Sequence, residues 1–246
     1  SDTNILVRFD VPNKRIDLVS LPRDTLLHNE YRNNKLNFAY AKGGTELLME
    51  QIENLLGIPV DFYVTVNLKG FIALVDQIDG VDFDIPINMD YDDPYQDLHI
   101  PFTKGPRHLN GQEAMEVVRF RHNNDGTGYG TEDIGRIGTQ QAFLKAVAKQ
   151  LLQIGNVKNI PALVDIFYTY VKTDLTTGNL VWLGNEALNI GTENIHFATL
   201  PGDGSGYYNK QSVYVLDAQA TCDLVNEALN PYNEALTLED MDILVP

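Results

Sequence analysis

The sequence has 246 residues, 43% of them hydrophobic, which is enough to bury a full core and too many for a disordered chain. Its 34 Asp and Glu outnumber its 18 Lys and Arg, giving a formal net charge of −16. No nucleic acid partner is expected, because neutralising phosphates needs a broad basic surface. No apolar run reaches about 18 residues, so no membrane-spanning helix is predicted. The single cysteine, Cys222, excludes an internal disulfide and is predicted to be a buried structural thiol.

The first part of the chain predicts two strands and a helix. Residues 4–9 and 15–21 are typical of strands, joined by a turn at 11–14. A helix is predicted after Gly43-Gly44, and Gly57 ends it. Its apolar stripe consists of Leu47, Leu48, Ile52, Leu55 and Leu56.

The middle of the chain predicts a second strand–helix–strand series. Residues 62–68 alternate between apolar and polar side chains, which is typical of a half-buried strand. A helix is predicted over 70–78 and a strand over 81–86. Residues 88–110 contain three prolines and are predicted to form a turn-rich excursion outside the core.

The second half is predicted to be mainly helical. One helix opens at Asn110-Gly111, and a longer one follows Asp133 with Phe143 and Val147 on its apolar side. The remaining predicted elements are helices at 160–171, 177–188 and 217–229 and a strand at 194–200. Strands interleaved with helices indicate an α/β sandwich with one continuous sheet, in a single domain.

Three of the eight arginines gather in residues 118–141, a stretch otherwise rich in Gly, Asn, Asp and Thr. Arg119 and Arg121 are two residues apart, so their side chains share a face if the backbone is extended and diverge if it is helical. Arg136 falls in the first turn of a predicted helix, where a cation opposes the helix dipole unless an anion is also bound. Gln140, four residues further on, shares the face of Arg136.

This stretch suggests a site for a phosphate or pyrophosphate. Guanidinium groups bind phosphate in a bidentate manner, and the free N–H groups at a helix start bind it too. The anion would lie between Arg119 and Arg121 and the helix start, which has Asp133 at its N-cap. Alternatively, the arginines pair with Asp125, Glu132 and Asp133 on a solvated surface, and the spacing alone leaves both interpretations open.

A second group of charged residues flanks the two N-terminal strands. Asp2 precedes the first strand and Arg23 follows the second, so an antiparallel pairing would make them neighbours. An Asp beside a phosphate site could help to hold Mg²⁺, which binds one or two carboxylates plus phosphate oxygens. A structural salt bridge between Asp2 and Arg23 is the alternative.

Taken together, these motifs resemble the LytR–CpsA–Psr family of cell-wall glycopolymer ligases, in order and over nearly the whole chain. The matching N-terminal residues are S-D-T at 1–3, L-P-R-D-T at 21–25, K-L-N-F-A-Y at 35–40, L-L-G-I-P-V-D-F-Y-V at 55–64 and F-I-A-L-V-D-Q-I-D-G-V-D at 71–82. The others are D-Y-D-D-P-Y-Q-D-L-H-I at 90–100, G-P-R-H-L-N-G-Q-E-A at 105–114, V-R-F-R at 118–121, D-I-G-R at 133–136, L-P-G at 200–202 and N-P-Y-N-E-A-L-T-L-E-D at 230–240. Thr139 departs from the pattern, since many members carry an arginine there.

The resemblance implies a single domain over residues 1–246, a three-layer α-β-α sandwich whose central mixed sheet is flanked by helices. It also implies that an N-terminal strand and a membrane anchor precede this chain in the full protein. The expected location is the extracellular face of the cytoplasmic membrane of a Gram-positive-type bacterium.

The implied activity is Mg²⁺-dependent transfer of a glycopolymer phosphate from an undecaprenyl-pyrophosphate carrier to a peptidoglycan sugar hydroxyl, with Mn²⁺ as a possible substitute. The polymer, whether teichoic acid, capsule or another, is left open. The implied roles are pyrophosphate binding by Arg23, Lys35, Arg119, Arg121, Arg136 and Gln140, metal binding by Asp2, and catalysis by Asp133 with Arg119 and Arg121. Phosphoryl transfer depends mostly on positioning and charge neutralisation, which such a cluster supplies.

An apolar slot is expected for the lipid, and residues at 62–68, Phe71, Ile72, Val75, Phe143, Leu144 and Val147 could line it or simply form core. Two other functions fit the same residues. One is a polyprenyl-pyrophosphate hydrolase, in which water replaces the sugar hydroxyl. The other is a non-catalytic module that binds the lipid phosphate.

Overall fold

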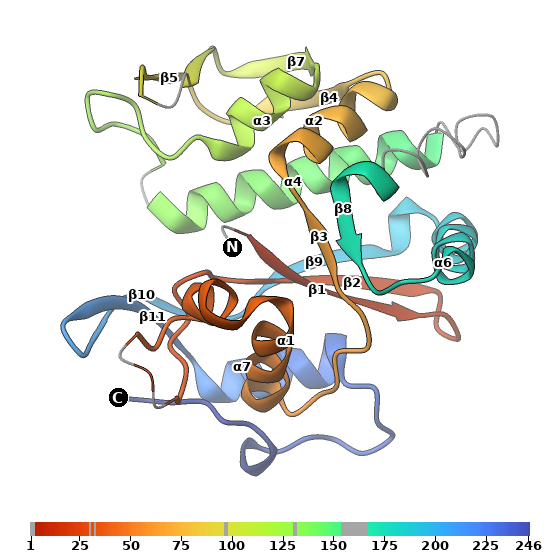
Figure 1. The fold of residues 1–246 in the computed structure, drawn as a ribbon, viewed down its shortest axis with the longest axis vertical. Coiled ribbons are helices and arrows are strands. Elements are labelled where there is room, and N and C mark those ends of the chain that lie inside the picture. Colours follow the sequence, from red (N-terminus) through yellow and green to blue (C-terminus); the bar gives the residue numbers. More distant parts are fainter. Residues whose placement is uncertain (1–2, 30, 32, 96–97, 130–131, 154–166) are drawn as a thin grey trace. The chain divides into compact units, whose positions relative to one another are not determined.

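The structure is a computed structural model that describes residues 3–29, 31, 33–95, 98–129, 132–153 and 167–246. The chain divides into two compact units, which are described in turn (Figure 1). Unit 1 comprises Ser1–Tyr63 and Asn194–Pro246, and unit 2 comprises Val64–Glu193. The single domain expected over residues 1–246 stays a prediction.

Unit 1 is built on a mixed three-stranded sheet in the order β1-β2-β9. Strands β1 (Asn4–Asp10) and β2 (Arg15–Leu21) pair antiparallel, and β9 (Ile195–Thr199) runs parallel to β2. All three strands were predicted. A hairpin of β10 (Gly202–Tyr208) and β11 (Gln211–Leu216) was not, because its first strand contains three glycines and little apolar alternation.

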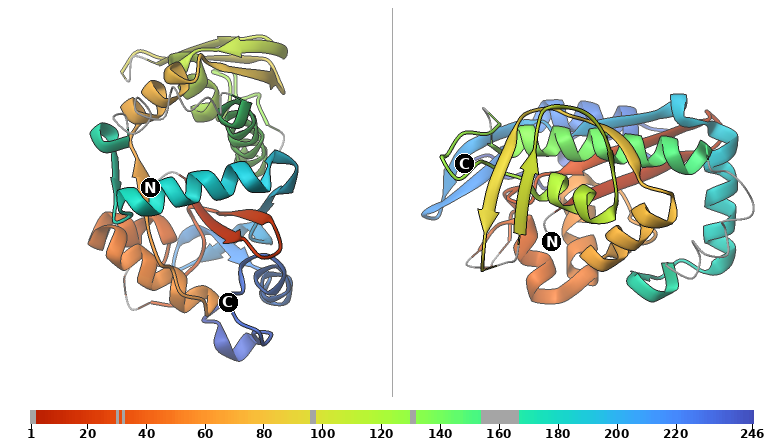
Figure 2. Two further views of the ribbon diagram at one scale, coloured as in Figure 1. Left: turned by 90° about the vertical axis from the view of Figure 1, so that its right-hand side faces the viewer. Right: turned by 90° about the horizontal axis from the view of Figure 1, so that it is seen from above.

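Helices α1 (Leu36–Leu56) and α7 (Ala218–Leu224) cover one face of this sheet (Figures 1 and 2). Helix α1 begins before the predicted start, since Gly44 interrupts it with a φ of 68° instead of preceding it. It ends at Gly57, whose left-handed φ of 66° and close approach to the Asp240 carbonyl both require glycine. The helix predicted over 217–229 is observed as α7 followed by a π-helical segment, η2 (Val225–Leu229). Two short 3-10 helices, η1 (Thr192–Asn194) and η3 (Leu238–Asp240), lie directly before β9 and after η2.

The core of unit 1 lies between the sheet and these helices. Its fully buried members include Val19 of β2, Leu36 and Leu56 of α1, and Val225 of η2. Cys222 is 4% exposed and contacts the Leu236 carbonyl, so the predicted buried thiol is confirmed.

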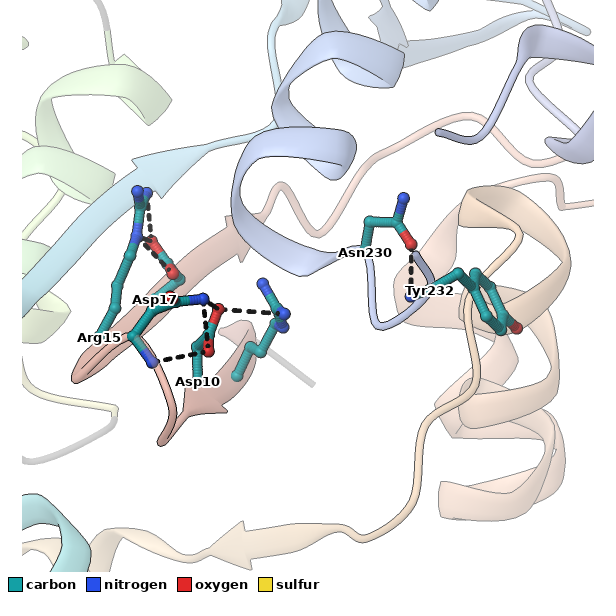
Figure 3. A network of polar contacts seen from close by, with 7 residues as sticks. Asp10, Arg15, Asp17, Asn230 and Tyr232 are labelled. Carbon is teal, nitrogen blue, oxygen red and sulfur yellow. Dashed lines mark hydrogen bonds and ion pairs between the residues drawn. The ribbon is translucent and has the colours of Figure 1, made fainter. Parts of the chain in front are cut away.

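Strand β2 also buries a charge, which an ion pair compensates (Figure 3). The Arg15 Nε lies 2.8 Å from both carboxylate oxygens of Asp17, and Asp17 is only 2% exposed. Glu227 of η2 accepts from the same guanidinium at 3.3 Å. The hydrogen bond to Asp17 raises the pKa of Arg15 above its ordinary value. This cluster therefore joins the sheet to η2 and accounts for Arg15 as a structural cation.

Unit 2 contains three two-stranded antiparallel sheets and four helices among its described residues. The strand pairs are β3 (Val64–Val66) with β8 (Val171–Thr173), β4 (Val81–Ile85) with β7 (Gly105–Leu109), and β5 (Met89–Asp93) with β6 (Leu98–Phe102). The helices are α2 (Leu68–Gln77), α3 (Gly111–Arg119), α4 (Glu132–Gln153) and α6 (Thr177–Ile190).

The core of unit 2 joins α2, α3 and α4 to the two sheets formed by β4–β7 and β5–β6. It includes Val75 of α2, Ile85 of β4, Ile100 of β6, Val117 of α3 and Phe143 of α4. The Phe143 ring meets Phe71 and Phe83 at centroid distances of 5.7 and 5.5 Å. The apolar side predicted for α4 is thus confirmed at Phe143 and Val147.

Residues 88–110 were wrongly predicted as an excursion outside the core. They form β5, β6 and β7, and Met89, Ile100 and Leu109 are at most 1% exposed. The prolines do not exclude strands here, because a proline on an edge strand removes no ladder hydrogen bond when its nitrogen faces away from the partner strand. Pro101 and Pro106 lie in two-stranded sheets, where every strand is an edge.

Three other expectations need correction or lie outside the described residues. The single continuous sheet is wrong, since the described strands form one three-stranded and four two-stranded sheets. The strand predicted over 62–68 shortens to β3, and its apolar side chains are exposed. The helix predicted over 160–171 lies mostly outside the described residues; residues 167–170 are helical, and Val171 begins β8. The predicted fold class, α/β with a mixed sheet and flanking helices, is confirmed.

Candidate functional site

The unit 1 part of the candidate site is the turn that follows β2. Thr25 closes this turn through its backbone N–H, 3.0 Å from the Pro22 carbonyl, and its hydroxyl, 2.7 Å from the same oxygen. The Asp24 carbonyl accepts from the Tyr214 N–H of β11 at 2.8 Å. Arg23 therefore projects from a segment whose backbone is fixed on both sides.

The start of α1 is held against the same turn. The N–H groups of Leu36 and Asn37 donate to the carbonyls of Thr25 and Arg23, at 3.0 and 2.9 Å. These are two of the N–H groups that a helix start leaves without partners inside the helix. Lys35 directly precedes α1, so the fold brings Arg23 and Lys35 together although they are twelve residues apart.

Asp24, which no motif spacing singles out, lies between these two cations. Its Oδ2 is 3.4 Å from the Lys35 Nζ, and its Oδ1 is 3.7 Å from the Arg23 Nε. The Asn37 side chain donates to Oδ1 at 3.0 Å. The signal for this contact was the Arg-Asp pair of L-P-R-D-T followed by K-L-N, but only the turn places the two motifs side by side.

The unit 2 part of the site begins at the end of α3. This helix opens with a capping box in which Asn110 and Glu113 satisfy each other's backbone N–H groups. Arg119 is its last residue, where a cation is favourable to the helix dipole, and its Nη1 lies 3.8 Å from the Met115 sulfur. Phe120 ends the helix with an extended backbone.

Arg119 is helical, so the two neighbouring arginines do not share one face of an extended strand. The residue between them, Phe120, is 1% exposed and packs edge-on against the Tyr129 ring at 5.6 Å. Arg121 is exposed. The buried ring thus fixes the backbone between Arg119 and Arg121.

Helix α4 carries Arg136 near its start, and this residue is only 5% exposed. The neighbouring Gly135 gives Tyr129 room, since a β-carbon there would lie 2.4 Å from the Tyr129 Cβ. The Thr139 hydroxyl donates to the Tyr129 hydroxyl at 2.9 Å. Burial raises the pKa of Tyr129, and this hydrogen bond opposes the rise.

Gln140 joins α4 to the end of α3. Its Nε2 donates to the Val118 carbonyl at 3.1 Å, directly before Arg119. This carbonyl belongs to the last turn of α3, where the intrahelical pattern ends. The end that carries Arg119 and the turn of α4 that carries Arg136 therefore lie side by side, as Figure 1 shows for α3 and α4.

The contacts of Asp125, in the loop between α3 and α4, bear on the alternative that the arginines pair with acidic residues on a solvated surface. Asp125 accepts from the Thr127 N–H at 2.9 Å and hydroxyl at 2.6 Å, and these bonds lower its pKa. Asn123 and Asn124 dock the loop on β5 by accepting from the Asp90 and Asp92 N–H groups. Asp125 is thus engaged within its own loop and positions no arginine through a hydrogen bond or ion pair seen among the described residues.

The remaining predicted site residues are only partly covered. Asp133 lies in the first turn of α4, which begins at Glu132, rather than at the predicted N-cap, and its side chain lies outside the described residues. Asp2, the predicted metal ligand, also lies outside them. Since Arg23 and Lys35 belong to unit 1 and the other arginines to unit 2, their convergence stays a prediction.

The described part of the chain contains no group of three or more His, Cys, Asp or Glu side chains arranged to hold a metal ion. None of its helices is both long and apolar enough to cross a membrane.

Some residues proposed for the lipid slot are core and others are exposed. Val75, Phe143 and Val147 are at most 8% exposed and belong to the core of unit 2. The apolar side chains along 62–68 are 46–52% exposed, namely Phe62, Val64, Val66 and Leu68. Of these exposed residues, Val64 and Val66 belong to β3, Leu68 begins α2, and Phe62 belongs to unit 1.

Comparison with known proteins identifies relatives over most of the chain. It is 32% identical over 229 residues to the polyisoprenyl-teichoic acid–peptidoglycan teichoic acid transferase TagV of Bacillus subtilis, covering 90% of this chain and 56% of TagV. It is 31% identical over 229 residues to TagU of Bacillus cereus, a transferase of the same description, covering 92% of this chain and 71% of TagU. The chain thus spans little more than half the length of TagV.

A solved structure agrees with these relatives. The crystal structure of Bacillus subtilis TagV matches with a TM-score of 0.78 and 27% identity, covering 100% of this chain and 91% of that one. The model of the LytR_cpsA_psr family matches residues 1–230. The chain therefore belongs to the LytR_cpsA_psr family.

Proposed function

We propose that this chain transfers a glycopolymer phosphate from an undecaprenyl-pyrophosphate carrier to a sugar hydroxyl of peptidoglycan. The observation that carries this proposal is the identity of 32% and 31% to two proteins named as polyisoprenyl-teichoic acid–peptidoglycan teichoic acid transferases. Arg136 near the start of α4 and Lys35 directly before α1 agree with a diphosphate ligand, because cationic side chains bind phosphate groups.

The reaction is a displacement at the phosphorus that carries the glycan. The acceptor hydroxyl oxygen forms a bond to this phosphorus, and the bond from phosphorus to the bridging oxygen breaks. Undecaprenyl phosphate leaves with that oxygen, and the glycan becomes a phosphodiester of the acceptor. The diphosphate is multiply charged, so binding it depends on neutralisation by cations, and the leaving oxygen gains further negative charge.

The chain's cations would supply this neutralisation. Arg23 and Lys35 contribute from a turn and helix start whose backbone is fixed by hydrogen bonds. Arg119, Arg121 and Arg136 contribute from the adjoining ends of α3 and α4, which the Gln140–Val118 hydrogen bond holds together. Preorganised cations stabilise the transition state without reorganising during the reaction.

Asp133 is the proposed base that takes the proton of the attacking hydroxyl. A helix start and nearby arginines keep a carboxylate ionised, although they also weaken it as a base. The Asp133→Ala variant should lose transfer by about 100-fold or more while keeping lipid binding. Loss of binding instead would show that Asp133 organises the pocket and takes no proton.

Mg²⁺, or Mn²⁺ in its place, is proposed as a cofactor that would add positive charge next to the diphosphate, with Asp2 helping to hold it. Residues of the exposed apolar row at 62–68 are proposed to contact the polyprenyl chain, since their exposure leaves apolar surface uncovered. The proposed carrier and acceptor support a location at the extracellular face of the cytoplasmic membrane of a Gram-positive-type bacterium, where an N-terminal membrane anchor would hold the protein.

One incubation distinguishes transfer from the two alternatives. The protein is mixed with a polyprenyl-pyrophosphate-linked glycan, Mg²⁺ and a peptidoglycan oligomer, and the products are separated by mass. Glycan joined to the oligomer through a phosphodiester is the expected product. Free phosphorylated glycan would identify a hydrolase, and bound but unchanged lipid would identify a binding module.

A further inference from the structure

Arg23 and Lys35 form the basic half-site of unit 1. Asp24 is an acidic residue within it, where a carboxylate opposes the binding of an anion. Its side chain is 30% exposed, and it lies within 4 Å of both cations of this half-site, 3.4 Å from the Lys35 Nζ and 3.7 Å from the Arg23 Nε. An anion at this place lowers affinity for a diphosphate through repulsion. Its presence therefore needs a reason specific to its neighbours.

The contacts of Asp24 give that reason. One carboxylate oxygen accepts from the Asn37 side chain at 3.0 Å and faces Arg23, and the other faces Lys35. Asn37 belongs to the first turn of α1, and its own N–H binds the Arg23 carbonyl at 2.9 Å. The carboxylate is thus held by a group that is itself tied to the turn carrying Arg23.

We infer that Asp24 is a positioning residue that holds the Arg23 and Lys35 side chains ready for the pyrophosphate. This inference rests on the proposed function. A lysine side chain has four rotatable bonds, and ordering it on ligand binding costs conformational entropy. Asp24 restricts the Lys35 side chain before the ligand arrives. Its negative charge also offsets the repulsion between the positive charges of Arg23 and Lys35 beside the start of α1.

The direction in which one substitution changes the affinity for a pyrophosphate tests this inference. Asp24→Asn keeps the size of the side chain and an oxygen for Asn37 but removes the charge. If positioning outweighs repulsion, the affinity for a short polyprenyl pyrophosphate falls roughly tenfold. If repulsion dominates, the affinity rises. Unchanged or increased affinity would overturn the inference.

A double-mutant cycle separates positioning from a general structural effect. In the background of Lys35→Gln and Arg23→Gln, Asp24→Asn should change affinity by less than about twofold, because the groups it positions are gone. An equal tenfold loss in both backgrounds would show that Asp24 acts on the fold and would contradict the inference. Asp24→Glu, which restores the charge, should recover part of the affinity.

Asp217→Asn is the matched control. Asp217 also lies in unit 1 and caps α7 by accepting from the Ala220 N–H at 3.0 Å, so its substitution removes the same charge elsewhere. It should leave pyrophosphate affinity unchanged. If the Arg23 and Lys35 double variant binds like the wild type, the proposed binding set itself fails. If that variant weakens while Asp24→Asn does not, only the role of Asp24 fails.

Discussion

Gln140 offers a test of how the arginines of unit 2 are held, because a second glutamine on the same helix makes the same kind of bond elsewhere. The Gln140 Nε2 donates to the Val118 carbonyl at 3.1 Å, next to Arg119. The Gln150 Nε2 donates to the Ile78 carbonyl at 3.2 Å, at the end of α2. Both side chains are half-buried.

Replacing either glutamine by leucine removes one hydrogen bond to the end of a helix. The expected loss in the free energy of unfolding is about 1 kcal/mol for each variant. For a chain of this size, that corresponds to a fall of roughly 2–4 °C in melting temperature. Thermal unfolding of each variant should show a loss of this order.

Their effects on ligand binding should differ. Gln140→Leu frees the end of α3 and should weaken binding of a short polyprenyl pyrophosphate about fivefold to tenfold, since misplaced cations lose preorganisation. Gln150→Leu should leave binding within about twofold. Isothermal titration calorimetry measures both affinities. Equal affinities of the two variants would refute the reasoning that the Gln140 bond positions these arginines.

Three further predictions concern pH, packing and metal. The hydrogen bond with Asp82 at 2.7 Å raises the pKa of His108. The small contribution of this bond to stability is therefore complete below about pH 6.5 and is lost as the pH rises through the raised pKa. NMR titration should show a lower pKa for His108 in Asp82→Asn, and an unchanged pKa would contradict this. Thr221→Val should raise the free energy of unfolding by about 1 kcal/mol, because the fully buried hydroxyl has no hydrogen-bond partner among the described residues. A lower midpoint of chemical denaturation in this variant would contradict the prediction. Chelation with EDTA should abolish transfer and excess Mg²⁺ should restore it, whereas full activity in EDTA would remove the metal from the proposal.

The predictions from sequence succeeded where short-range patterns determine the structure. The strands at 4–9 and 15–21 and the helix after Asn110 follow from alternation, turn residues and a capping signal, and all appear. They failed where pairing partners decide the outcome. Residues 88–110 contain buried side chains at alternate positions of β6, but three prolines in the same stretch are a stronger local signal for turns than this short alternation is for a strand.

The candidate site shows the same division. Spacing placed Arg136 and Gln140 on one helix face, and the structure agrees that both lie in α4. Spacing did not show that Gln140 binds the Val118 carbonyl or that Asp24 lies between Arg23 and Lys35. Those contacts join segments that come together only through helix packing and the turn after β2.

A crystal structure of this chain with a bound short polyprenyl pyrophosphate would test the proposed site most directly. We predict that the diphosphate oxygens lie within hydrogen-bonding distance of guanidinium groups from both units, namely Arg23 and at least one of Arg119, Arg121 and Arg136. A diphosphate bound away from these side chains, or contacted by one unit alone, would contradict it.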